Sequence, residues 1–421
     1  MMEEWREYKI GDICNIKHGF AFKGIHFVDE PQKYVCVTPG NFGLKGGFKN
    51  DKPKFYNGPI PEDYILHKDD LVVTMTDLSK NGDTLGFSAL IPEDKNYIFL
   101  HNQRIGLVEK LSKEIDKHFL YWVMRTYGYQ RYIVSHSSGS TVKHTSPSNI
   151  GSYTFKCPNI QYQKSIASIL DNLDDKIEVN RRINENLEQQ AQALFKSWFV
   201  DFEPFKNGEF VESELGMIPK GWRVLEAQDI FSINIGKTPP RKEQEWFTEN
   251  DEDNIWVSIA DMGSCGMFIS DSSEYLINDA IKRFNIQMVE KNSVLLSFKL
   301  TVGRVAIAGA RLTTNEAIAR FILPDEHYRE FLYLYLKQYK YGNLGSTSSI
   351  ATAVNSKTIK GMKLLFSSTD IISAFSKKTK PLFDKIEVLL KESRRLAQLR
   401  DTLLPRLMSG ELKVNEIENV L

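Results

Sequence analysis

The chain contains one five-residue sequence twice. Asp175-Lys176-Ile177-Glu178-Val179 returns unchanged as Asp384-Lys385-Ile386-Glu387-Val388, at an offset of 209 (384 − 175). Earlier in each copy, Phe119-Leu120-Tyr121 returns as Phe331-Leu332-Tyr333, at an offset of 212 (331 − 119). At the start of each copy, Trp5 returns as Trp222, at an offset of 217 (222 − 5). The slowly shrinking offset indicates loop deletions inside one repeated unit. Arrays of small repeats have periods of about 20–50 residues, so a period this long indicates a duplicated domain.

A heptad pattern of mainly apolar residues follows each copy of the domain. In the first, the positions alternate in steps of four and three: Ile166, Leu170, Leu173, Ile177, Asn180, Asn184, Leu187, Ala191, Leu194 and Trp198. The second pattern comprises Phe383, Ile386, Leu390, Ser393, Ala397, Arg400, Leu404 and Leu407. Such seams predict two coiled-coil helices that pair with one another. On this interpretation Asn180 and Asn184 fix the register of the pair at a cost in packing. The alternative is two surface helices, each packed on its own domain.

The order of the chain makes a pair of these helices antiparallel, because each would leave its own domain and run towards the other. About 30 residues at a rise of 1.5 Å give a length of roughly 45 Å. One turn of B-DNA is about 34–36 Å long, so the pair has a suitable length to space two readers of DNA. Pro381 and Pro405 predict kinks or boundaries in the second helix, and Gly410 predicts its end.

The remaining sequence reads as two mixed α/β domains. Short β-rich runs such as 71–75 and 294–298 alternate with turns, and helices are expected near 113–133 and 328–341. The predicted fold class is therefore α+β, with two α/β domains related by a pseudo-twofold axis and joined by two long antiparallel helices. The predicted boundaries are 1–157 for the first domain, 158–203 for the first helical region, 204–368 for the second domain with its entry linker, and 369–421 for the second helical region.

The composition is that of a globular protein with balanced charge. There are 54 basic and 54 acidic residues, which argues against a chain that holds DNA by itself, because phosphate neutralisation dominates the affinity of most DNA binders. The four cysteines are scattered and suit the reducing cytosol. No apolar run is long enough to span a membrane, so a cytoplasmic protein without a membrane partner is expected.

A search for catalytic and cofactor motifs favours binding over catalysis. Gly236-Lys237-Thr238 imitates the end of a phosphate-binding loop, but it lacks the upstream glycine and is followed by two prolines. No Gly-x-Gly-x-x-Gly occurs, and the histidines have no metal-ligand spacing. An enzyme with duplicated active sites should duplicate its catalytic residues, whereas this repeat keeps Trp, Gly and helix residues. We therefore expect no catalytic residue, bound cofactor or metal site in this chain.

Three segments carry a resemblance to a known family. They are Leu194-Phe195-Lys196-Ser197-Trp198-Phe199-Val200-Asp201-Phe202-Glu203-Pro204-Phe205, the carboxy-terminal run 399–412, and Ile218-Pro219-Lys220-Gly221-Trp222. They resemble the conserved regions and domain openings of the DNA-specificity subunits of type I restriction–modification enzymes.

This resemblance implies a non-catalytic subunit with two target-recognition domains, each reading half of a split, asymmetric site in double-stranded DNA. It also implies that the paired helices set the spacer and dock two modification subunits, which carry S-adenosylmethionine and methylate adenine at N6. Restriction subunits would add ATP- and Mg-dependent cleavage of DNA.

Two loops in each copy are candidates for contact with DNA. The loop after the helix offers hydroxyls and cations in the first copy and hydroxyls in the second; the alternative there is a flexible polar turn. The other loop, 76–86 or 299–304, includes Arg304 as a candidate for guanine, with a structural salt bridge as the alternative. The candidate residues are Ser140, Thr141, Lys143, His144, Thr145, Thr76, Lys80, Asn81, Lys299, Arg304, Ser346, Thr347, Ser348 and Ser349.

Two other functions compete with DNA recognition. A coiled-coil scaffold with duplicated ligand-binding domains would need no DNA. A fused restriction–methylation enzyme would need a methyltransferase motif, and the sequence contains none.

Overall fold

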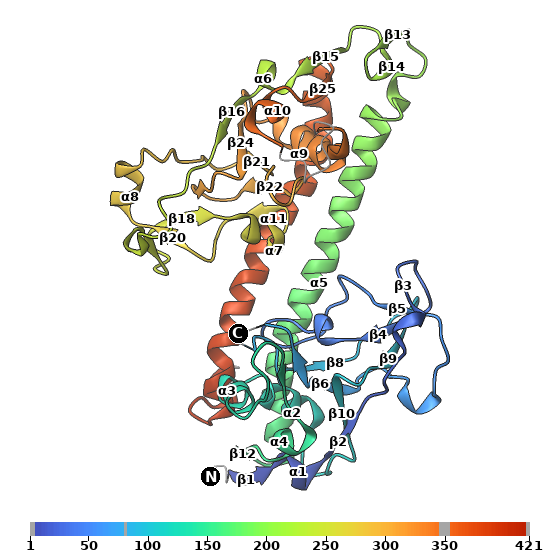
Figure 1. Ribbon diagram of the computed structural model, residues 1–421, viewed down its shortest axis with the longest axis vertical. Coiled ribbons are helices and arrows are strands. Elements are labelled where there is room, and N and C mark those ends of the chain that lie inside the picture. Colours follow the sequence, from blue (N-terminus) through green and yellow to red (C-terminus); the bar gives the residue numbers. More distant parts are fainter. Residues whose placement is uncertain (1–4, 80–81, 345–353, 418–421) are drawn as a thin grey trace. The chain divides into compact units, whose positions relative to one another are not determined.

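The computed structural model describes residues 5–79, 82–344 and 354–417 (Figure 1). The chain divides into two compact units. Unit 1 comprises Met1–Lys176 and Arg395–Leu421, and unit 2 comprises Ile177–Arg394. Each of the two long helices, α5 (Ile160–Phe199) and α11 (Thr369–Met408), therefore contributes one part to each unit.

Unit 1 is built on two four-stranded sheets, in the orders β2-β10-β6-β8 and β3-β5-β4-β9. In the second sheet β4 and β9 are parallel, and β1 pairs with β12 separately. The buried helix α2 contributes Phe119, Leu120 and Trp122 to the core, which continues onto α5 through Ile166 and Leu170. The strands are β1 (Arg6–Lys9), β2 (Asn15–His18), β3 (Phe27–Val28), β4 (Tyr34–Val37), β5 (Phe55–Tyr56), β6 (Leu71–Thr74), β7 (Thr76–Asp77), β8 (Ser88–Leu90), β9 (Ile98–His101), β10 (Ile105–Glu109), β11 (Lys143–His144) and β12 (Thr154–Cys157); the short helices are α1 (Ile10–Ile13), α2 (Lys117–Val123), α3 (Tyr127–Ser135) and α4 (Pro147–Gly151), and α12 (Val414–Ile417) follows α11.

Unit 2 repeats this topology. Its sheets have the orders β16-β24-β21-β22-β19 and β17-β20-β18-β23, and β15 pairs with β25. Here too the last pair of the second sheet, β18 and β23, is parallel. The strands are β13 (Phe210–Ser213), β14 (Gly216–Pro219), β15 (Arg223–Glu226), β16 (Ser232–Ile235), β17 (Phe247–Thr248), β18 (Asn254–Val257), β19 (Phe268–Ile269), β20 (Tyr275–Leu276), β21 (Val294–Ser297), β22 (Val305–Ala308), β23 (Thr313–Thr314), β24 (Ile318–Ile322) and β25 (Lys363–Phe366); the helices are α6 (Ala227–Ile230), α7 (Ile259–Ser264), α8 (Asn278–Arg283), α9 (Tyr328–Gln338) and α10 (Ser356–Lys360).

The repeat keeps a glycine at one position of each unit, Gly19 and Gly236, and close backbone packing requires it in both. A Cβ atom on Gly19 would lie 2.1 Å from the backbone oxygen of Asn102, and one on Gly236 would lie 2.0 Å from that of Asn315. Any side chain would push the first strand of the sheet away from this neighbour. The repeat therefore preserved framework residues, as the sequence indicated. The predicted fold class of two α/β domains with long antiparallel helices is confirmed, while the pseudo-twofold axis stays a prediction.

The long helices run antiparallel within each unit. In unit 2, Asn180 of α5 donates from Nδ2 to Glu392 of α11 at 2.8 Å, while the Phe199 ring lies 5.0 Å from that of Phe375. Later positions of one helix thus meet earlier positions of the other. In unit 1, Asp174 meets Arg400 in the same sense.

The seam residues are buried to different extents. Asn180 and Ile386 are buried, whereas Ile177, Asn184, Leu187 and Leu390 are half-buried. The Asn180–Glu392 bond gives the pair a polar contact that an offset register would break.

The long predicted helices begin, break and end partly where the sequence indicates. The helix expected near 113–133 is wrong as one element, because Thr126 starts a new helix by accepting a hydrogen bond from the Tyr129 N–H. A boundary at Pro381 or Pro405 is also wrong, since α11 continues as one helix through both, while a kink at these prolines stays a prediction. The predicted end at Gly410 is confirmed: α11 ends at Met408, and Gly410 has a φ of +74°. The sequence-based domain boundaries stay a prediction.

Candidate nucleic-acid interface

Two candidate loops of unit 1, distant in sequence, meet at one short ladder. β7, which opens the loop 76–86, pairs antiparallel with β11, which lies in the loop 137–146. The Thr76 hydroxyl lies 3.1 Å from Nδ1 of His144. Backbone hydrogen bonds also join Ser138 and His144, which closes the second loop into a turn. The fold thus makes one surface from two segments that the sequence offered separately.

The candidate residues of this surface have unequal access to a partner. Ser140, Thr141 and His144 are exposed and Lys143 is half-buried, so their hydroxyl, imidazole and ammonium groups can reach a ligand. Thr76 and Thr145 are only 5% and 9% exposed. Both residues belong to the backbone pairing of this surface, Thr76 in β7 and Thr145 through its N–H bond to the Met75 oxygen. The expectation that they contact DNA directly does not fit their burial. Lys80 and Asn81 lie outside the described residues.

Asp77 holds the loop that follows β7. Its carboxylate accepts from the backbone N–H of Ser79 at 2.6 Å, and from the backbone N–H and hydroxyl of Thr84 at 2.5 and 2.8 Å. Burial alone would raise the pKa of Asp77, but these hydrogen bonds outweigh burial and lower it. Asp77 is therefore an ionised anchor for the loop, and sequence reasoning missed it.

In unit 2 the candidate cations differ in orientation. Lys299 is exposed. Arg304 instead donates from Nη1 to the backbone oxygen of Ile259 at 2.5 Å, with its guanidinium packed on Gly263. This contact is structural, although it is a bond to a carbonyl rather than the salt bridge considered as the alternative. Ser346, Thr347, Ser348 and Ser349 lie outside the described residues.

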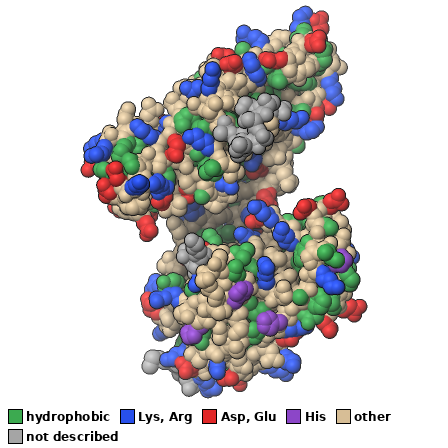
Figure 2. Space-filling model, viewed as in Figure 1, with side chains coloured by type: hydrophobic (Ala, Val, Ile, Leu, Met, Phe, Trp, Pro, Cys, Tyr) green, Lys and Arg blue, Asp and Glu red, His purple; other side chains and the backbone are tan. Residues whose placement is uncertain are grey.

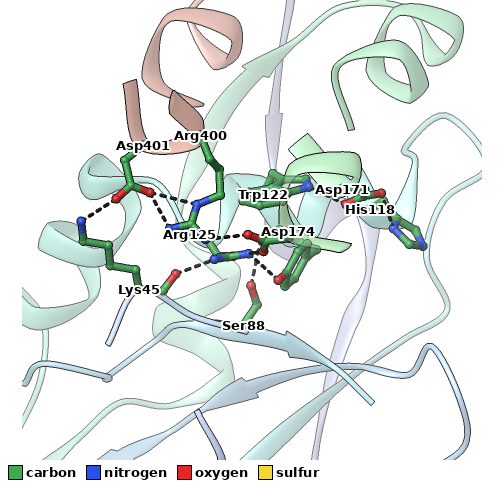
Figure 3. A network of polar contacts seen from close by, with 10 residues as sticks. Lys45, Ser88, His118, Trp122, Arg125, Asp171, Asp174, Arg400 and Asp401 are labelled. Carbon is green, nitrogen blue, oxygen red and sulfur yellow. Dashed lines mark hydrogen bonds and ion pairs between the residues drawn. The ribbon is translucent and has the colours of Figure 1, made fainter. Parts of the chain in front are cut away.

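A polar network fastens the recognition fold of unit 1 to the parts of α5 and α11 that belong to it (Figure 3). Arg125, with a side chain 3% exposed, lies at its centre. Its guanidinium donates to the backbone oxygen of Lys45 at 2.8 Å and to Asp174 at 2.5 Å, and it lies 4.2 Å from the centroid of the Trp122 ring. Asp174 also accepts from Arg400 at 2.5 Å.

The same network extends to both sides of Arg125. Asp401 accepts from Arg400 at 2.7 Å and from the Lys45 ammonium at 2.6 Å. On the other side, Asp171 accepts from the Trp122 indole at 2.7 Å and lies 2.8 Å from Nδ1 of His118. Sequence reasoning missed this network. The available signal was Arg400, a cation on an apolar seam, which requires a carboxylate nearby.

Charge is mixed over the face seen in Figure 2. Lysines and arginines alternate with acidic residues on each unit, and histidines gather on unit 1. Within the described ranges, no group of three His, Cys, Asp or Glu side chains could hold a metal ion. A pocket of about 630 Å³ in unit 1 is lined by Lys9, Asp12, Lys17 and Glu109 among others, and none of the candidate DNA-contacting residues lines it. No helix in the described part of the chain is long and apolar enough to cross a membrane.

Comparison with known proteins places this architecture in a family. The model described as "Type I restriction modification DNA specificity domain" matches residues 2–189 and 219–367. The type I restriction enzyme HindI specificity subunit of Haemophilus influenzae is 27% identical, over 98% of this chain and 100% of its own length. The MjaIX specificity subunit of Methanocaldococcus jannaschii is 30% identical, over 79% of this chain and 73% of its own length.

A solved structure shows the same fold. The S subunit of a type I restriction–modification system from M. genitalium has a TM-score of 0.56 at 17% identity, covering 96% of each chain. The family model matches both copies of the repeat and most of the sequence. This chain therefore belongs to the family of DNA-specificity subunits of type I restriction–modification systems.

Proposed function

We propose that each unit of this specificity subunit reads one half of a split DNA site, and that the paired helices set the spacer and dock modification subunits. A specificity subunit recognises DNA and is itself non-catalytic. S-adenosylmethionine would be bound by two modification subunits that methylate adenine, and ATP and Mg by restriction subunits. The complex would work in the cytoplasm.

The observation that carries the proposal is that the two units share the same sheets but have different loops. Both units have the same order of strands in their two main sheets, apart from β19, which is added in unit 2. The candidate loops nevertheless differ, since β7 and β11 pair in unit 1 next to the stretch 76–86, whereas unit 2 has the shorter stretch 299–304. Equal frames with unequal loops suit two readers that recognise different base sequences.

Docking of two copies of one subunit is supported by the identical five residues in α5 and α11. The isoleucine turns inward in both, with Ile386 buried and Ile177 half-buried. The valine turns outward in both: Val179 is 47% exposed and Val388 is 58% exposed. Two equal apolar positions on the surface suit two equal partners.

Co-purification with the modification subunit, followed by methylation mapping of genomic DNA, tests the proposal. We expect a split motif with a fixed spacer. Exchange of residues 1–157 for another recognition domain should change one half of that motif and leave the other half unchanged. A complex that forms but methylates no split motif would favour the scaffold interpretation.

The docking positions can be tested separately. Asp in place of both Val179 and Val388 should reduce co-purification of the modification subunit, because a charge would have to be buried in each contact. Val200→Asp is the matched control, since Val200 is 49% exposed at the end of α5 but lies outside the repeated five residues. Equal co-purification of the double variant and the control would reject these positions as docking sites.

A further inference from the structure

A buried hydroxyl closes one loop in the same way in both units. In unit 1, Thr74 donates from Oγ1 to the backbone oxygen of Thr84 at 2.6 Å and accepts from the Gly86 N–H at 3.0 Å. In unit 2, Ser297 donates from Oγ to the backbone oxygen of Thr301 at 2.6 Å and accepts from the Arg304 N–H at 3.0 Å. Both hydroxyl residues are fully buried at the end of the central strand, β6 or β21.

The backbone around these hydroxyls matches as well. The Gly86 N–H donates to the Thr74 backbone oxygen at 3.1 Å, and the Gly303 N–H donates to that of Ser297 at 3.0 Å. Both glycines have positive φ, +82° and +94°. The residue that follows the buried hydroxyl residue is also buried in each unit: Met75 after Thr74, and Phe298 after Ser297. The two loops therefore start and end on the same frame.

The stretch of chain between the two ends of this loop differs in length between the units. In the sequence, eight residues (76–83) separate Met75 from Thr84 in unit 1, whereas two, Lys299 and Leu300, separate Phe298 from Thr301 in unit 2. A surface that docks the same protein twice should keep the same residues in both copies of the repeat, as the outward valines of α5 and α11 do. A surface that reads different half-sites must differ. The variable stretch inside a constant frame therefore suits contact with DNA better than contact with a shared protein partner.

Leu300 is the exposed tip of the short loop. Its side chain is 98% exposed, and its φ of +59° lies in the left-handed region that a leucine rarely adopts. Such strain persists only where the surrounding structure enforces it, and it is frequent at functional sites. The neighbouring Lys299 and Thr301 are exposed, so an ammonium group and a hydroxyl flank the apolar tip. A cation for phosphate beside an apolar group for a base is a combination typical of DNA readers.

We propose that Leu300 contacts the methyl group of a thymine in the half-site read by unit 2, with Lys299 on the adjacent phosphate and Ser297 holding the loop in position. Thymine is the base whose edge offers an apolar group in the major groove. This proposal rests on the proposed function.

The test uses the complex of this chain with its modification subunit and synthetic duplexes of the mapped site. The half-site of unit 2 is the half that exchange of residues 1–157 leaves unchanged. Replacing its thymines by deoxyuridine, one at a time, should lower kcat/KM for methylation about fourfold at one position. Leu300→Ala should lower kcat/KM about tenfold on the thymine duplex, and deoxyuridine should then cause no further loss.

Ile322→Ala is the matched control, because Ile322 is 46% exposed on β24 of the same unit. It should leave kcat/KM and the effect of deoxyuridine unchanged. The proposal would be overturned by a Leu300→Ala complex that keeps the deoxyuridine effect, by a half-site without thymine on either strand, or by loss of the modification subunit from that complex. Failure of the wild-type complex to methylate a split motif would instead reject the proposed function.

The role of Ser297 is tested by two substitutions. Ser297→Ala removes the bonds to Thr301 and Arg304 and should reduce discrimination between thymine and deoxyuridine. Ser297→Thr installs the residue that unit 1 uses at Thr74 and should restore it. A Ser297→Ala complex with full discrimination would show that the hydroxyl does not position the loop.

Discussion

At the scale of single residues, Arg125 joins the recognition fold of unit 1 to its helices. Arg125→Met keeps the length of the side chain but leaves Asp174 and the Lys45 carbonyl without this donor. Loss of one partner from a buried ion pair costs about 3 kcal/mol, and we expect a decrease of that order in the free energy of unfolding by urea. Arg131→Met is the control, since Arg131 is exposed and its guanidinium lies over the Tyr127 ring, 5.5 Å from the centroid. Equal effects of the two substitutions would contradict the central place of Arg125.

His118 makes the same network sensitive to pH. The hydrogen bond with Asp171 raises the pKa of His118 above its ordinary value of 6.5, against the opposing effect of burial. A pKa that is raised on folding stabilises the folded state below the unfolded pKa of about 6.5. This stabilisation is lost as the pH rises through the higher pKa of the folded state.

As the pH rises from about 6.5 through the folded-state pKa of His118, the Tm of His118→Gln should therefore decrease less than the Tm of the wild type. His18→Gln, at an exposed position, serves as the control. An unchanged pH profile for His118→Gln would exclude the pair as the cause.

At the scale of elements, the two seam asparagines are expected to differ. Among the residues that the structure describes, the buried Oδ1 atoms of Asn180 and Asn184 have no hydrogen-bond partner, but only Asn180 has a bond from Nδ2 to Glu392. A lone buried polar atom costs about 1–3 kcal/mol. Asn184→Leu should therefore raise Tm, and Asn180→Leu should raise it less because it also breaks the bond to Glu392. Calorimetry of both variants measures this, and a lower Tm for Asn184→Leu than for Asn180→Leu would contradict it.

The helix pair also predicts the effect of changing its length. Insertion of one heptad into α5 adds about 10.5 Å of helix and moves Asn180 or its neighbours out of register with α11. We expect loss of methylation from a one-sided insertion, and recovery with a longer spacer when a second heptad is inserted near 386–404. Methylation mapping measures the spacer. Full activity at the unchanged spacing from a one-sided insertion would show that the helices do not set it.

At the scale of the whole molecule, the balanced charge predicts weak binding of DNA by this chain alone. With 54 basic and 54 acidic residues, little net phosphate neutralisation is available. We expect a Kd of roughly micromolar or weaker for the isolated chain, typical of non-specific binding, and much tighter binding with the modification subunit. Fluorescence anisotropy at fixed salt measures both. Nanomolar, sequence-specific binding by the isolated chain would contradict this expectation.

The sequence by itself determined the duplication, the long helices, the family and the framework glycines. These features are periodic or repeated, so they are visible in one dimension: a seam recurs every three or four residues, and Gly19 recurs as Gly236. Only the tertiary structure decided which side chains meet. Arg125, Asp174 and Arg400 are far apart in the chain, and Arg304 turned inward because a backbone carbonyl of α7 accepts a hydrogen bond from its guanidinium. The exposure of Leu300 also depends on a buried hydroxyl that holds the loop from beneath, and no local sequence pattern records such a contact.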